Sequence, residues 1–205
     1  MMTRYVLQIV LFTLGAFLVV MGGCAGTSPP ANFYVLSSLP ESAAGTLPTG
    51  DKTRLAIGIG PVNLPDYLDR SQIVTRISLN ELKVAAFERW AEPLNSSFPR
   101  ILMENLAMLL NTDQVAVYPW RKAIPVEYQV VVDIIRFDAS PGENAVLIAR
   151  WSLLGNGGNN LHVIKKSTFR KTIGSNDYAA MVAAQSQTVI EFSREIAAAI
   201  KAISQ

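Results

Sequence analysis

The sequence of 205 residues contains one cysteine and one histidine. A single cysteine excludes an internal disulfide bond and a redox-active cysteine pair, and a single histidine beside it excludes a zinc site of the cysteine and histidine type. Charged residues make up 17% of the chain and hydrophobic residues 50%, a balance that excludes a disordered protein. The length accommodates one ordinary domain together with an export segment.

The sequence also lacks a surplus of charge. It has 18 Lys and Arg against 16 Asp and Glu, a net charge of +2. Residues 1–23 contain one base, Arg4, and no acid, so the remainder has 17 bases, 16 acids and a net charge of +1. Proteins that bind nucleic acid through charge carry a strong basic surplus. The composition therefore gives no support for a nucleic-acid partner.

A long apolar run stands at the start of the chain. Residues 5–23 are 19 residues without a charge, preceded by Arg4. Such a run is long enough to span a membrane, and it is typical of a signal peptide when small residues and a cleavage site follow. It ends in Gly22 and Gly23, directly before Cys24. A signal anchor with an incidental cysteine is the alternative.

The order of a hydrophobic stretch, two small residues and a cysteine resembles the lipobox of bacterial lipoprotein precursors. The resemblance implies that residues 1–23 are a lipoprotein signal peptide, cleaved between Gly23 and Cys24. It also implies that the Cys24 sulfur forms a thioether to diacylglycerol and that the new amine is acylated. Two or three acyl chains, at roughly 0.8 kcal/mol per buried methylene, form a stable anchor. Ala25 at the next position implies sorting to the outer membrane.

Residues 24–31 form a short tether that contains two prolines. The seven residues after Cys24 reach at most about 25 Å when fully extended. We therefore expect the folded domain, residues 32–205, to lie close to its membrane. Its nearly balanced charge leaves the acyl group, rather than a basic patch, to hold it there.

The segments after the tether alternate between strand and helix patterns. Three segments rich in Val and Ile, residues 128–138, 144–154 and 161–171, are separated by glycines and predict an antiparallel meander. Apolar residues recur at helical spacing in residues 96–111, where Asn111 is the expected stop, and in residues 175–203, where Ser175 or Asn176 is the expected cap. Two helices on one face of a sheet define an α+β layer architecture. We predict a single α+β domain with an antiparallel-dominated mixed sheet and two helices packed on one face.

Two smaller features of the sheet are also predicted. Residues 72–78 and 82–90 read as a hairpin with Leu79 in its turn. Asp133 lies among aliphatic residues of a strand, and strict alternation places Arg136 on the opposite face. A partner for Asp133 would then come from a neighbouring strand, with Arg150 as the candidate.

No catalytic constellation is found. His162, the sole histidine, falls in a predicted strand as an outward-facing residue, and a Gly-x-Ser-x-Gly elbow is missing. Asp66 and Asp69 lack a third ligand nearby. We assign no catalytic residue, no metal site and no cofactor. A hydrolase would need Asp66, Asp69, Asp133 and Asp138 to meet in space.

Loops rich in aromatic residues and proline are the better functional candidates. Interfaces between proteins favour Trp, Tyr and Arg as anchors. The candidate partner interface consists of Pro65, Asp66, Tyr67, Leu68, Arg89, Trp90 and Trp120. The alternative is that these side chains fold inward and fill the ends of the sheet.

Several motifs occur in a characteristic order. They are Phe33-Tyr34-Val35-Leu36, Val62-x-x-Pro65-Asp66-Tyr67-Leu68, Trp90-Ala91-Glu92-Pro93-Leu94, Trp151-Ser152-Leu153-Leu154 and Tyr178-x-x-Met181-Val182. Together they resemble the PqiC/YmbA family of ABC-type transport auxiliary lipoproteins, over nearly the whole chain.

The resemblance implies a non-enzymatic lipoprotein, lipid-anchored to the outer membrane on its periplasmic face. Its partner would be an MCE-domain protein of an ABC system that moves lipids between the two membranes, and self-association into a homo-oligomeric ring is left open. The alternative function is a stand-alone lipoprotein that binds lipid or a small ligand. That function requires an apolar cavity of about 300 Å³ or more.

Overall fold

The computed structural model describes residues 4–5, 29–40, 53–120 and 125–204. The chain divides into two compact units, Met1–Pro30 and Ala31–Gln205. The predicted cleavage site at Gly23 and Cys24 lies outside the described residues. Within the described parts of the chain, no helix combines the length and the apolar character needed to cross a bilayer.

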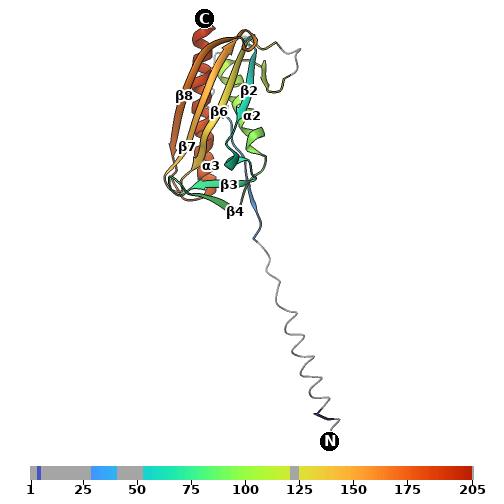
Figure 1. The fold of residues 1–205 in the computed structure, drawn as a ribbon, viewed down its shortest axis with the longest axis vertical. Coiled ribbons are helices and arrows are strands. Elements are labelled where there is room, and N and C mark those ends of the chain that lie inside the picture. Colours follow the sequence, from blue (N-terminus) through green and yellow to red (C-terminus); the bar gives the residue numbers. More distant parts are fainter. Residues whose placement is uncertain (1–3, 6–28, 41–52, 121–124, 205) are drawn as a thin grey trace. The chain divides into compact units, whose positions relative to one another are not determined.

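The described residues of the second unit form an eight-stranded sheet and two helices (Figure 1). The strands are β1 (Asn32–Tyr34), β2 (Ile57–Asn63), β3 (Gln72–Arg76), β4 (Leu82–Trp90), β5 (Val115–Val117), β6 (Tyr128–Ala139), β7 (Asn144–Gly155) and β8 (Asn160–Thr172). The helices are α2 (Leu94–Leu110) and α3 (Tyr178–Ile203), with short 3-10 turns η2 (Asp66–Leu68) and η3 (Asn156–Gly158).

The central strand of the sheet is β6. One of its edges pairs with β7, which pairs with β8, and both pairings are antiparallel. The other edge pairs in parallel with β2 and, at Ala139, with β3. β2 continues in parallel to β5, while β3 pairs antiparallel with β4 and β4 in parallel with β1. The three longest strands thus form the predicted antiparallel meander, and the short strands add the parallel pairs of a mixed sheet.

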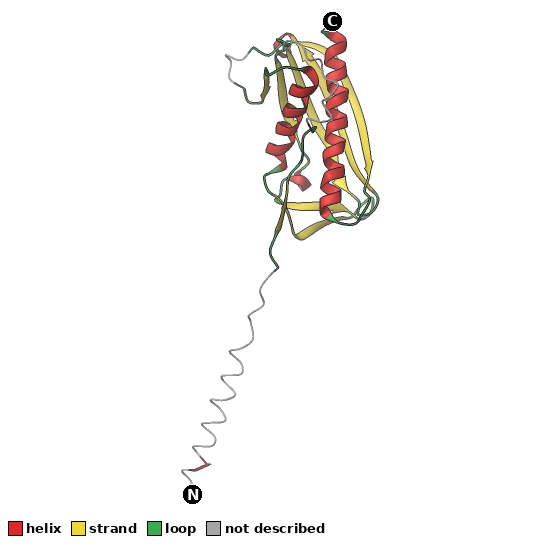
Figure 2. Ribbon diagram, turned by 180° about the vertical axis from the view of Figure 1, so that it is seen from behind, coloured by secondary structure: helices red, strands yellow, loops and turns green. Residues whose placement is uncertain are grey.

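Both helices cover the same face of the sheet, as Figure 2 shows. α3 lies on β7 and β8, α2 lies on β2 and β5, and the two helices contact each other. Phe98 of α2 meets Phe137 of β6 edge-on, with ring centroids 5.4 Å apart, and Trp151 of β7 meets Phe192 of α3 at 6.3 Å. These four side chains are among the largest fully buried ones. The predicted single α+β domain with two helices on one face is confirmed.

The helix ends differ slightly from the prediction. The N-cap of α3 is Asp177, whose carboxylate accepts a hydrogen bond from the Ala180 amide at 2.7 Å, one or two residues later than expected. α2 begins at Leu94, two residues early. Its predicted stop at Asn111 is confirmed, because Asn111 adopts the left-handed conformation that ends many helices.

After β1 the chain runs between the two helices (Figure 2). Leu36 and Leu39 are buried there. The Leu39 amide donates to the side-chain oxygen of Asn105 in α2 at 2.7 Å, and the Asn105 amide group donates to Ser193 of α3 at 3.0 Å. Because the buried Asn105 is satisfied on both sides, it ties this segment and both helices together.

One irregularity in β6 overturns a prediction. The pairing with β7 steps from Ile134 to Arg136, which leaves Ile135 as an extra residue. A bulge of this kind shifts the alternation of faces by one residue. Arg136 therefore lies on the same face as Asp133, and its prediction on the opposite face was wrong.

Candidate functional site

The folded unit has two ends that differ in their surfaces. Tyr34 of β1 lies against Tyr178 at the start of α3, with ring centroids 6.3 Å apart. The 26 residues of α3 span about 39 Å, so its last turn lies at the opposite end. We call the end with β1, the β3–β4 hairpin and the start of α3 the tether end. The end with the start of β6, the β7–β8 turn and the last turn of α3 is the far end (Figure 1).

Two members of the predicted partner interface belong to the core. Trp90 and Leu68 are buried among the apolar residues between sheet and helices. These two side chains therefore follow the alternative, in which they fold inward. Asp66 is exposed, while Pro65, Tyr67 and Arg89 are half-buried. Trp120 lies apart from them, at the far end.

Tyr67 belongs to a polar cluster around Asp138, whose side chain is fully buried. The Oδ2 atom of Asp138 accepts from Nε and Nη2 of Arg76 at 3.0 and 2.8 Å and from the Tyr67 hydroxyl at 3.3 Å. Its Oδ1 atom accepts from Nε of Arg136 at 2.7 Å. Burial raises the pKa of Tyr67, and the charge of Asp138 adds to the effect. A buried carboxylate is costly unless opposite charges and hydrogen bonds compensate it, and here two guanidinium groups do so. The cluster therefore has a structural role.

The four carboxylates of the hydrolase hypothesis do not form one site. Asp138 is enclosed by its cluster, and Asp133 is exposed and accepts a hydrogen bond from Asn63 at 2.7 Å. Asp66 and Asp69 are exposed beside a small hollow of about 150 Å³. Among the described residues, no three of His, Cys, Asp and Glu come together in a group that could bind a metal ion.

Trp120 packs on the sheet face that the helices leave open. An added Cβ at Gly58 of β2 would come within 2.9 Å of the Trp120 ring, so the glycine makes room for the indole. Tyr118 meets Trp120 edge-on at 5.5 Å and is 54% exposed. Tyr118 was not among the predicted interface residues. The signal that could have found it is its position two residues before Trp120, at the end of the same short strand.

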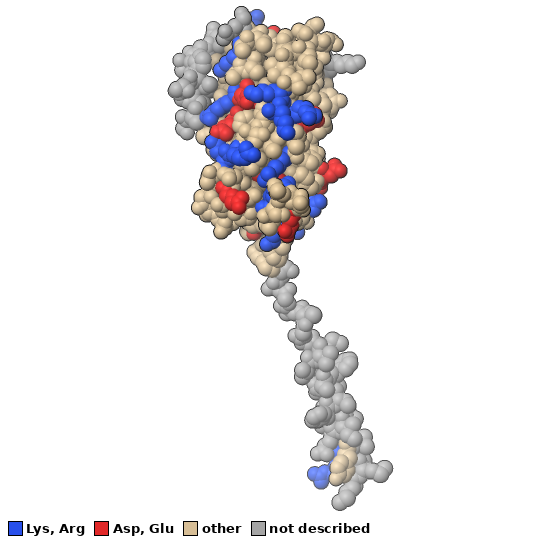
Figure 3. Space-filling model, turned by 60° about the vertical axis from the view of Figure 1, so that its left-hand side comes forward, with Lys and Arg blue, Asp and Glu red and all other residues tan. Residues whose placement is uncertain are grey.

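The open face of β6, β7 and β8 carries basic and apolar side chains together. Asp133, Arg150 and Lys166 stand in register across the three strands, so Arg150 is the strand neighbour expected for Asp133. Figure 3 shows Lys and Arg in bands over this side of the molecule, with Asp and Glu between them. Ile135 and Ile164 are exposed on the same strands.

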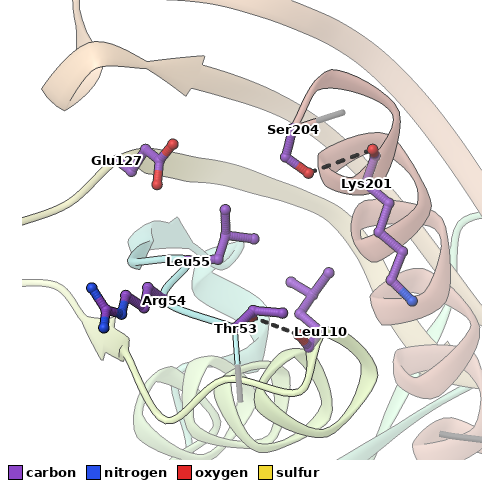
Figure 4. A pocket seen from close by; sticks show the side chains of 7 residues that line it. All are labelled: Thr53, Arg54, Leu55, Leu110, Glu127, Lys201 and Ser204. Carbon is purple, nitrogen blue, oxygen red and sulfur yellow. Dashed lines mark hydrogen bonds between the residues drawn. The ribbon is translucent and has the colours of Figure 1, made fainter. Parts of the chain in front are cut away.

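A hollow of about 350 Å³ lies at the far end (Figure 4). It is lined by Thr53, Arg54, Leu55, Leu110, Glu127, Lys201 and Ser204. Figure 4 shows the charged groups of Arg54 and Lys201 turned to opposite sides, with Leu55 between them. Two of the seven lining residues are apolar. Because a site for an acyl chain must enclose most of the chain, this open surface hollow with three charged residues in its lining does not match an acyl-chain cavity.

The comparison with protein families agrees with the resemblance that the motifs indicate. Residues 34–197 match the family model described as ABC-type transport auxiliary lipoprotein component. The chain belongs to this family of auxiliary lipoproteins, and the predicted likeness to PqiC and YmbA is confirmed. No curated protein matches the sequence.

Two examples illustrate the solved structures that are similar to this fold. One is a crystal structure of an uncharacterized protein, with 20% sequence identity and a TM-score of 0.68, covering 84% of this chain and 99% of its own. The other is protein XCC0632 from Xanthomonas campestris, of family DUF330, with 18% identity and a TM-score of 0.67, covering 85% of this chain and 99% of its own. At these identities the likeness shows the fold alone.

Family membership defines the class of protein. The protein is a lipoprotein, anchored at a membrane of the cell envelope, and it is an auxiliary component of an ABC-type transporter. The family is described as a transport component and not as an enzyme.

Proposed function

We propose that this protein is an outer-membrane lipoprotein, anchored through Cys24 on the periplasmic face. In this proposal it docks the MCE-domain protein of an ABC system that moves lipids between the two membranes. The observation that carries the proposal is the family match over residues 34–197. The order of Gly22, Gly23 and Cys24 supports lipidation, and Ala25 after the cysteine supports outer-membrane sorting.

The proposed role is one of position rather than chemistry. Acyl chains on Cys24 and a tether of seven further residues keep the domain within about 25 Å of the bilayer. A partner that reaches this membrane then meets the domain at a high effective concentration, and binding is strengthened without any new contact. The charged lining of the far-end hollow favours this role over stand-alone lipid binding, for which an apolar cavity is needed.

The far end is the surface that we assign to the partner. The tether joins the domain at β1, and α3 leads from there to the far end over about 39 Å. When the tether end faces the bilayer, a partner that approaches from the inner membrane meets the far end first. Tyr118 and Trp120 lie there on the open face, and exposed aromatic side chains are frequent anchors of protein interfaces. Asp66, which is exposed, and Arg89, which is half-buried, remain weaker candidates for contact with the partner.

The experiment is capture of the MCE-domain protein by the full chain and by a Trp120→Ala variant. Loss of an interface anchor costs about 2 kcal/mol or more, so binding should weaken roughly 30-fold. The matched control is Val35→Ala, which also shortens an exposed apolar side chain but lies directly after β1 at the tether end.

The unfolding midpoint of each variant shows whether the domain remains intact. Equal affinity of Trp120→Ala and the native protein would remove the far-end assignment. Failure of the native protein to bind any MCE-domain protein would remove the proposed function.

A further inference from the structure

The tether end carries most of the large exposed apolar side chains in the described part of the second unit. Five of them form what we call the tether-end patch: Phe33, Ile77, Leu79, Val84 and Phe87, which are 64%, 50%, 89%, 43% and 39% exposed. Single exposed apolar residues are ordinary, but a group of this size on one small sub-sheet marks an interaction site.

Two members of the patch, Phe33 and Phe87, belong to neighbouring strands. Phe33 of β1 stands in register with Arg89 of β4, and Phe87 precedes Arg89 by two residues. Strand residues that are in register, or two apart, share one face of a sheet. Phe33 and Phe87 therefore lie on the same face.

Leu79 stands at the tip of the β3–β4 hairpin and the hairpin holds it in place. The amide of Ile77 donates to the carbonyl of Glu81 at 3.0 Å, which closes the turn. Nη1 of Arg76 donates to the carbonyl of Leu79 at 3.2 Å, while its other nitrogens bind the buried Asp138. The most exposed leucine side chain of the described residues is thus presented by a turn that is bonded to the buried cluster.

The path of the chain identifies what this patch faces. β1 begins at Asn32, eight residues after Cys24, and eight extended residues reach at most about 29 Å. An acyl anchor on Cys24 therefore keeps the tether end near the bilayer; this step rests on the proposed function. Exposed Lys83 and exposed Glu81 offset each other here, so the apolar side chains, rather than a basic patch, supply the attraction to lipid.

We propose that the tether-end patch is a second membrane contact, with the Leu79 hairpin tip inserted among the lipid headgroups and upper acyl carbons. An acyl anchor alone leaves the domain free to turn about its tether. A second contact through β1 and the hairpin fixes its orientation, so that the far end points away from the membrane.

The test places a fluorescent NBD probe at the hairpin tip of the full, acylated chain. Cys24 is the sole cysteine and its sulfur carries the acyl anchor, so the thiol of a Leu79→Cys variant is the one that reacts with the probe. The protein is reconstituted in vesicles of phosphatidylethanolamine and phosphatidylglycerol with nitroxide groups on the upper acyl carbons. The matched control is Leu161→Cys, 52% exposed at the β7–β8 turn of the far end.

We expect the nitroxide lipids to reduce the emission at residue 79 by about half or more, and to leave residue 161 nearly unchanged. Equal quenching at both positions overturns the proposal. A signal at residue 79 that changes with protein concentration but not with lipid also overturns it, because the patch would then mediate contacts between copies of the protein. Protein that floats with the vesicles but is not quenched overturns the second contact alone. Protein that does not float overturns the Cys24 anchor, and this contact with it.

Discussion

The tether end and the far end of the folded unit treat charged side chains in opposite ways. At the tether end, Asp138 is fully buried and accepts hydrogen bonds from Arg76, Arg136 and Tyr67. At the far end, Arg54, Glu127 and Lys201 surround a hollow of about 350 Å³ and are exposed.

The difference between buried and exposed charges affects how much each contributes to the stability of the domain. Breaking a buried ion pair leaves an uncompensated charge, whereas an exposed charge contributes little. The Asp138 cluster at the tether end is therefore sensitive to the loss of a single partner. The exposed charges around the far-end hollow are not.

The largest expected effect comes from Cys24, the residue that we propose to carry the acyl anchor. Cys24→Ala should leave an uncleaved precursor that incorporates no labelled palmitate, because the acylated atom is gone. Immunoblotting for size and metabolic labelling measure both effects. As a control, Thr27→Ala within the same tether should be processed normally. Normal cleavage and labelling of Cys24→Ala would contradict the lipobox interpretation.

The next effect contrasts the charges of the two ends directly. Asp138→Ala should lower the free energy of unfolding by about 3–5 kcal/mol, because two guanidinium groups lose their buried partner. Glu127→Ala at the far end should change it by less than about 0.5 kcal/mol. Denaturant unfolding of both variants measures the contrast, and similar losses in the two would show that the ends do not differ in this way.

The smallest effect is a pH dependence at the tether end. The hydrogen bond with Glu88 raises the pKa of Tyr34 to about 12, with smaller contributions from burial and from the charge of Glu88. A raised pKa in the folded state means that the stabilisation is complete below about pH 10, the ordinary tyrosine pKa, and is lost as the pH rises from 10 to 12.

Titration of phenolate absorbance, taken as the difference between the native protein and Tyr34→Phe, isolates this group. Glu88→Gln should move the Tyr34 midpoint back toward pH 10. An unchanged midpoint in that variant would show that Glu88 is not the cause.

The parts of the fold that follow from local patterns could be predicted. The three long strands and both helices appear in the spacing of apolar residues, and the stop of α2 appears in Asn111. The parallel pairings of β2 with β6 and of β1 with β4 join segments far apart in sequence, and local spacing does not encode them. The bulge at Ile135 was missed because alternation assumes that each strand residue has one partner, whereas this residue has none.

The candidate surface was harder to predict than the fold. Trp90 and Trp120 are both tryptophans at strand ends, yet one is buried in the core and the other lies on the open face. The difference depends on which element covers each strand, and that is tertiary information. Leu79 was correctly expected in a turn, but its place on the same small sub-sheet as Phe33 and Phe87 depends on strand pairing between distant segments.

The segment that runs between the two helices determines how the domain responds to a pulling force. A load applied through the tether reaches β1 first, and its pairing with β4 lies along the strand, so the hydrogen bonds are sheared together rather than opened one after another. The same load then meets Leu36 and Leu39, which are buried between the two helices, and the bonds of Asn105 distribute it to α2 and α3. A load on the tether is therefore shared among β4, α2 and α3.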